Sequence, residues 1–126
     1  ILALAAARLG ARSVEGFDFD PDAVRIARQN ARRNGLDKVR FVRRDVLGWV
    51  PRRRFDVVLA NLFSEVLVAA APRLAAAVAQ GGCLILSGVL REQLGDTLEA
   101  FGAAGLAPAR TAARGKWVAA ELRHPG

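Results

Sequence analysis

The sequence predicts a doubly wound α/β fold with a mostly parallel sheet and an antiparallel hairpin at its C-terminal end. Short apolar runs typical of strands alternate with longer segments of helical periodicity. Such alternation places parallel strands in one sheet with helices against its faces. Two final runs, around residues 109–112 and 116–122, are close enough to pair as the hairpin. We expect residues 1–126 to form a single domain.

The first half of the chain is predicted to contain two helices and two strands. In order, they are a helix at residues 1–9 that Gly10 ends, a strand at 13–17, a helix from Asp20 to Asn34 and Gly35, and a strand at 39–42. The second helix has the clearest start, because Asp20 suits the N-cap and Pro21 suits the first helical position. Glycine is favoured just beyond a helix, which supports both predicted ends.

The second half continues the alternation. Its predicted elements are a strand at residues 55–60, a helix at 64–79 restarted at Pro72, a strand at 83–87 after Gly81 and Gly82, a helix at 91–104, and the hairpin. The run at 55–60 is apolar apart from Asp56, which is typical of a strand covered on both faces in a parallel sheet.

Composition narrows the class of protein. With 52% hydrophobic and 25% charged residues, the chain resembles a globular protein, and its apolar runs are too short to span a membrane. The single cysteine, Cys83, excludes an internal disulfide and suits the reducing cytoplasm. The net charge of +7 permits proximity to the ribosome or its RNA, although an arginine-rich solvated surface explains it more simply.

The start of the sequence is unusual. The chain has no methionine, and it opens within an apolar helix that lacks a capping residue. We therefore expect it to be a fragment of a longer protein.

Three polar residues follow predicted strands, where ligands bind in doubly wound folds: Asp18, Asp45 and Asn61. The carboxylate of Asp18 could accept both hydroxyls of a ribose, because Asp20 is better placed to cap the next helix. Asp45 could accept the exocyclic amine of an adenine, or it could be a turn residue beside arginines. Asn61 could hold a methyl-accepting amine or touch a cofactor, and its alternative is a turn or helix-cap role.

The sequence gives little support for a catalytic triad or a metal site. His124 is the only histidine and belongs to a polar tail, so a catalytic triad is not expected, and no cluster has the spacing of metal ligands. We expect Cys83 to be a core residue, and Trp49 and Trp117 to be packing groups. Methyl transfer to an amine remains compatible with this residue set, because it depends mainly on alignment of the reacting groups.

Several segments together resemble the ribosomal protein L11 methyltransferase family, a group of Rossmann-like class I methyltransferases that use S-adenosyl-L-methionine. They are ILALAAARLGA, GFDFDPDAVRIARQNARRNG, FDVVLANLF, CLILSGVLREQ and GKWVAAEL. The family has an aliphatic residue after the asparagine of FDVVLANLF, where related amine and amide methyltransferases have Asn-Pro-Pro. The resemblance covers nearly the whole chain, and the order and spacing of the segments carry it.

The resemblance implies a partial methyltransferase domain without its first central strand and glycine-rich loop, hence inactive alone. The intact enzyme would N-methylate lysine side chains and the α-amine of ribosomal protein L11. Asp18 would bind the ribose, and Asn61 would lie near the methyl-transfer centre. Three alternatives stay open: a class I methyltransferase for RNA or a small molecule, a nucleotide-binding oxidoreductase domain, and a non-catalytic module that binds ribosomal RNA.

Overall fold

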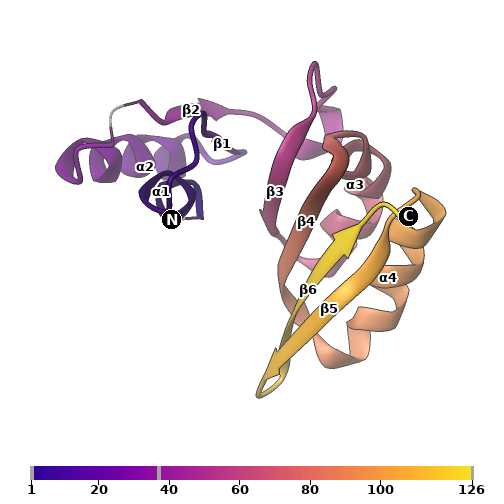
Figure 1. Cartoon of the computed structure of the whole chain (residues 1–126). Coiled ribbons are helices and arrows are strands. Elements are labelled where there is room, and N and C mark those ends of the chain that lie inside the picture. Colours follow the sequence, from indigo (N-terminus) through magenta and orange to yellow (C-terminus); the bar gives the residue numbers. More distant parts are fainter. Residues whose placement is uncertain (1, 37, 126) are drawn as a thin grey trace. The chain divides into compact units, whose positions relative to one another are not determined.

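A computed structural model describes residues 2–36 and 38–125. Contacts between residues divide the chain into two compact units, Ile1–Trp49 and Val50–Gly126 (Figure 1). The predicted α/β class is confirmed, with helices and strands alternating along the chain. Among the described residues, no helix is both long and apolar enough to cross a membrane.

The first unit contains a two-stranded parallel sheet. Its elements are α1 (Leu2–Arg8), β1 (Glu15–Asp18), α2 (Pro21–Arg33), β2 (Arg40–Arg43) and the 3-10 turn η1 (Val46–Gly48). β1 pairs with β2 from Glu15 opposite Arg40 to Asp18 opposite Arg43. The buried core of this unit consists of Leu4, Val24, Ala31 and Phe41. Both strands therefore run in the same direction and end at the same edge of this small sheet.

The ends of α2 confirm the sequence prediction. Asp20 is the N-cap, and its Oδ1 accepts a hydrogen bond from the backbone N–H of Asp22 at 2.9 Å. Pro21 occupies the first turn, where its missing N–H costs nothing. At the other end Asn34 is the C-cap, and Gly35 follows with a φ of 67°. These local signals fix where α2 begins and ends.

The second unit contains a four-stranded mixed sheet with the order β3-β4-β6-β5. Its elements are β3 (Phe55–Asn61), α3 (Ser64–Ala76), β4 (Val78–Leu90), the 3-10 turn η2 (Arg91–Gln93), α4 (Leu94–Ala103), β5 (Ala107–Arg114) and β6 (Trp117–Arg123). β3 and β4 are parallel, whereas β6 is antiparallel to both β4 and β5. The predicted C-terminal hairpin is confirmed.

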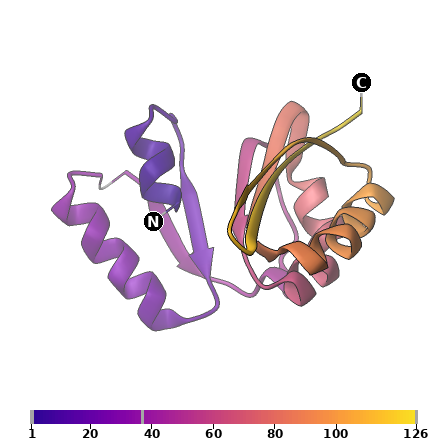
Figure 2. The same cartoon turned by 90° about the horizontal axis from the view of Figure 1, so that it is seen from below.

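The helices α3 and α4 lie on one side of this sheet (Figure 2). Alternate residues of the strands face them and are buried: Ala60, Leu84, Leu86, Val118, Ala120 and Leu122. Leu67 of α3 and Phe101 of α4 are fully buried as well. The expectation that β3 is covered on both faces is wrong within this unit, because Val57 is 52% exposed.

The start of β4 differs from the sequence prediction. Helix α3 continues through Pro72 without restarting, and it ends at Ala76 rather than at residue 79. The backbone N–H of Phe55 donates to the carbonyl oxygen of Ala77 at 2.7 Å, and Phe55 is paired with Val78. Val78 and Ala79 therefore belong to β4, although the alanine-rich sequence before them favours a helix.

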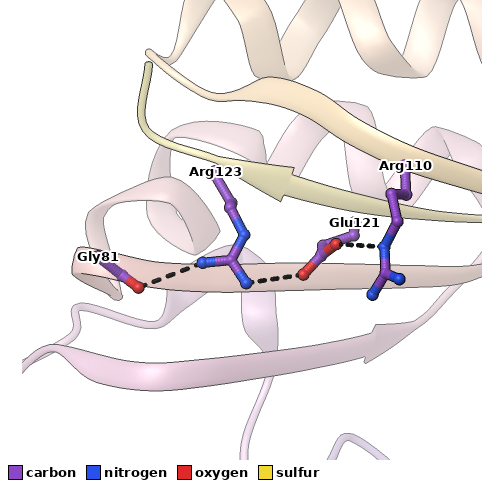
Figure 3. A network of polar contacts seen from close by, with 4 residues as sticks. All are labelled: Gly81, Arg110, Glu121 and Arg123. Atoms are coloured by element: carbon purple, nitrogen blue, oxygen red, sulfur yellow. Dashed lines mark hydrogen bonds and ion pairs between the residues drawn. The ribbon is translucent and has the colours of Figure 1, made fainter. Parts of the chain in front are cut away.

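Arginines flank a glutamate on the C-terminal hairpin (Figure 3). Arg110 Nε donates to Glu121 Oε2 at 3.0 Å, and Arg123 Nη2 donates to Glu121 Oε1 at 2.9 Å. Arg123 also donates to the carbonyl oxygen of Gly81 at 3.3 Å, which joins β6 to β4. The hydrogen bonds from Arg110 and then from Arg123 lower the pKa of the Glu121 carboxyl.

Replacing Glu121 with glutamine is expected to reduce the acid sensitivity of the chain. Because the folded pKa lies below the ordinary value of 4.5, ionised Glu121 stabilises the fold at higher pH, and this contribution is lost as pH falls through the folded pKa. Urea unfolding at several pH values measures the effect, with Glu99→Gln at an exposed position of α4 as the control. Parallel pH profiles for Glu121→Gln and the unaltered chain would contradict the assignment.

Candidate functional site

The candidate residues lie where the sequence predicted them, at or just after the carboxyl ends of strands. Asp18 is the last residue of β1, and Asp45 follows β2 by two residues. The backbone N–H of Arg44 donates to the carbonyl oxygen of Asp18 at 2.9 Å, so the exit of β2 lies directly beside Asp18. Asn61 is the last residue of β3, in the second unit.

Asp18 keeps an oxygen available for a ligand. Its Oδ1 accepts from the backbone N–H of Asp20 at 2.9 Å, whereas Oδ2 has no hydrogen-bond partner within the described residues. The side chain is exposed. The expectation that Asp20 rather than Asp18 caps α2 is confirmed. A carboxylate held by one oxygen can accept a hydroxyl with the other.

Asp45 has a local structural role. Its Oδ1 accepts from the backbone N–H of Leu47 at 3.0 Å, which makes it the N-cap of the 3-10 turn that follows β2. Asp45 therefore has the turn role that the sequence analysis gave as one of its two possibilities. Since only Oδ1 makes this bond and the residue is exposed, the carboxylate retains capacity for a second partner.

Aromatic and basic side chains surround this edge of the first unit. Arg43 Nε donates to the carbonyl oxygen of Phe19 at 3.0 Å, and its guanidinium lies 5.2 Å from the centroid of the Phe19 ring. The ring of Phe17 meets Trp49 edge-on at 5.0 Å, which confirms Trp49 as a packing group. Arg44 lies 5.3 Å from the Phe17 ring centroid.

Phe19 is a candidate that the sequence reasoning missed. It directly follows Asp18 and is 62% exposed, so its ring is accessible to a ligand. An aromatic face beside a hydrogen-bonding carboxylate is suited to the flat ring of a nucleoside base. The signal was present in the sequence as an apolar residue between the two acids of FDFD.

Asn61 has an unengaged side chain. Asn61 is exposed, and its carboxamide makes no hydrogen bond to any residue in the described ranges. The helix-cap alternative for Asn61 is wrong, because α3 has Phe63 at its N-cap position and no side-chain cap. A carboxamide at a strand end offers two donors and an acceptor to a ligand.

A groove in the first unit lies elsewhere. It runs between the second half of α2 and the start of β2, and it is lined by Arg28, Ala31, Arg32, Val39, Arg40 and Phe41. β2 begins there and ends beside Asp18. The groove is therefore at the opposite end of the strand from the candidate residues.

Some expectations about other residues need correction. His124 is not simply solvated: its Nε2 lies 3.1 Å from the carbonyl oxygen of Val78, and the side chain is partly buried. Trp117 is 47% exposed, with Lys116 Nζ 5.4 Å from its ring centroid, so it packs less than expected. Cys83 is buried in β4, as predicted. Within residues 2–36 and 38–125, no group of histidine, cysteine and acidic side chains is suited to a metal ion.

Comparison with known proteins gives a consistent result. A sequence model of the ribosomal protein L11 methyltransferase family matches residues 1–125. A curated ribosomal protein L11 methyltransferase from Geobacter sulfurreducens is 49% identical over 126 residues, which are all of this chain and 41% of the relative. The one from Pelotomaculum thermopropionicum is 46% identical over 98% of this chain and 40% of the relative. The chain thus spans about two fifths of the length of these relatives.

Solved structures agree. The crystal structure of a ribosomal protein L11 methylase from Lactobacillus delbrueckii subsp. bulgaricus superposes with a TM-score of 0.93 at 27% identity, covering 99% of this chain and 65% of that one. A magnesium protoporphyrin IX methyltransferase from Synechocystis, solved with bound SAH, has a TM-score of 0.78 at 21% identity, over 98% and 68% of the two chains, and thus shares the fold. On the evidence of sequence and fold, the chain belongs to the ribosomal protein L11 methyltransferase family.

Proposed function

We propose that this chain is the cofactor-binding part of an S-adenosyl-L-methionine-dependent protein methyltransferase that N-methylates lysine side chains and the α-amine of ribosomal protein L11. The family match over residues 1–125 is the observation that carries the proposal. When bound, the cofactor supplies an electrophilic methyl group on a sulfonium. Such a protein would work in the cytoplasm, where ribosomal proteins are made.

Asp18 is the residue proposed to bind the ribose of the cofactor. Its exposed Oδ2 has no partner within the described part of the chain, while the bond from the Asp20 N–H fixes the other oxygen. Hydrogen bonds to a charged acceptor contribute roughly 1.5–3 kcal/mol each. The free oxygen of the carboxylate can therefore accept a ribose hydroxyl.

Asp45 and Phe19 are proposed to recognise the adenine. The second oxygen of Asp45 would accept the exocyclic amine, and the exposed ring of Phe19 would cover a face of the base. The support for Asp45 is its position after β2 and its fixed orientation as the cap of a turn. Phe19 is supported by its exposure directly beside Asp18.

Asn61 is proposed as the catalytic residue. Its carboxamide oxygen would accept a hydrogen bond from the substrate amine and orient the nitrogen lone pair, and the same side chain would contact the cofactor. The amine must be neutral, which costs a lysine about 4.6 kcal/mol at pH 7 in water because its pKa is about 10.4. Removal from water lowers that cost, so no histidine base is needed near Asn61.

The positive charge of the chain supports a second part of the proposal, which is proximity to ribosomal RNA. A net charge of +7 would favour an encounter with ribosomal RNA around the protein substrate, as an aid to association rather than a catalytic feature. No observation favours the oxidoreductase or the non-catalytic RNA-binding alternative.

The substrate assignment is tested with a chimera in which this chain replaces the matching segment of the Geobacter sulfurreducens relative. Incubated with methyl-labelled S-adenosyl-L-methionine, the chimera should label purified L11 on lysine side chains and the α-amine, as located by mass spectrometry. The unaltered relative is the control. Label in ribosomal RNA instead of L11 would refute the substrate, and a folded chimera that labels neither would refute the activity.

Asp18→Ala in this chimera is expected to weaken S-adenosyl-L-methionine binding by about 1.5–3 kcal/mol, because it removes a charged acceptor. Asp22→Ala is the matched control, since it removes the same charge from an exposed site on the neighbouring helix. Isothermal titration calorimetry measures both. Equal affinities for the two variants would remove Asp18 from the site.

A further inference from the structure

Gly88 lies directly beside the carboxamide of Asn61. The pairing of β4 with β6 shifts register between Leu86 and Val89, so Gly88 sits in an irregular stretch of the strand. Its φ is 79°, a conformation that side-chain-bearing residues rarely adopt. On the other side of β4, Asn61 pairs with Ser87, which brings the end of β3 to this same point.

The carboxamide of Asn61 occupies the space that a side chain at position 88 would need. A Cβ placed on Gly88 would overlap Oδ1 of Asn61 and lie 3.5 Å from its Cγ. The other glycines with positive φ have no atom within 4 Å of such a Cβ; they are Gly10, Gly35, Gly81, Gly105 and Gly115. Turn geometry alone therefore does not explain Gly88, because the space that its missing side chain leaves is filled by Asn61.

The orientation of the Asn61 side chain depends on the space beside it. Its carboxamide makes no hydrogen bond to the described residues, so hydrogen bonding does not fix its orientation. An exposed asparagine would otherwise populate several side-chain rotamers. The backbone pairing of Asn61 with Ser87 fixes where the side chain starts, and the missing side chain of Gly88 leaves room for its end.

We propose that Gly88 is a positioning residue for the methyl-transfer step. The absence of a side chain at Gly88 leaves the space in which the carboxamide of Asn61 lies, and this places its oxygen to receive the substrate amine. The proposal rests on the proposed function of Asn61. A residue larger than glycine at position 88 would displace the carboxamide of Asn61.

The experiment compares Gly88→Ala with Gly81→Ala in the chimera. Gly81 is the matched control because it has the same φ of 79° in the same strand and no neighbouring atom at the Cβ position. Gly88→Ala should lower kcat for L11 methylation by about 10- to 100-fold, since small misplacements of reacting groups have effects of that order. Gly81→Ala should change kcat by less than about threefold.

A double-mutant cycle isolates the contact with Asn61. In an Asn61→Ala background, Gly88→Ala should cost no more activity than Gly81→Ala, because the displaced group is gone. The side-chain amide resonances of Asn61 in an NMR spectrum give a readout independent of activity. They should move in Gly88→Ala and stay unchanged in Gly81→Ala.

The outcomes separate this inference from the proposed function. If Asn61→Ala lowers kcat while Gly88→Ala matches Gly81→Ala, the role of Gly88 is refuted and that of Asn61 stands. If Asn61→Ala has no effect, the catalytic role of Asn61 fails. Should Gly88→Ala alone not fold, the Asn61→Ala/Gly88→Ala double variant should fold as well as Gly81→Ala. Failure of that double variant to fold would also refute the inference.

Discussion

The parallel pairing of β3 with β4 is the interaction on which the candidate site of the second unit depends. It begins where Phe55 binds the carbonyl oxygen of Ala77 and ends where Asn61 lies opposite Ser87. Side chains alternate between the faces of a sheet, so a slip of one residue would turn Asn61 toward the buried face that α3 and α4 cover. The buried Ala60 of β3 opposes such a slip, because the slip would turn it away from α3 and α4. The hydrophobic core therefore fixes the position of a polar residue at the strand end.

The first unit uses a comparable arrangement on a smaller scale. The parallel pairing of β1 with β2 places Asp18 beside the exit of the second strand. Asp20 and Pro21 begin α2 two residues later, and this separate cap leaves Asp18 outside the helix. In both units the candidate residue, Asp18 or Asn61, thus ends a strand, while a different residue begins the next helix. Asp18 and Asn61 are therefore separate from the residues that begin α2 and α3, whereas Asp45 is itself the cap of a turn.

Features with a local cause could be predicted from the sequence, and features that depend on pairing could not. The start of α2 at Asp20 and the glycine after its end are set by neighbouring residues, as is the hairpin of β5 and β6. The start of β4 at Val78 depends instead on a partner strand more than twenty residues away, which overrides the helical preference of the alanines. The closeness of Gly88 to Asn61 has the same origin, since it needs the registers of β3, β4 and β6 together. Asp18, Asp45 and Asn61 could be located at strand ends, but the cap made by Asp45 was only one of two possibilities.

Hydrogen–deuterium exchange of the chimera, with and without S-adenosylhomocysteine, tests most directly whether the candidate residues bind the cofactor. The account predicts slower exchange on binding at the backbone amides that follow β1 and β3, around Phe19 and Phe63. Exchange in the groove between α2 and β2, at residues such as Arg32 and Arg40, should not change. Protection confined to that groove, with the amides after Asp18 and Asn61 unaffected, would contradict the account.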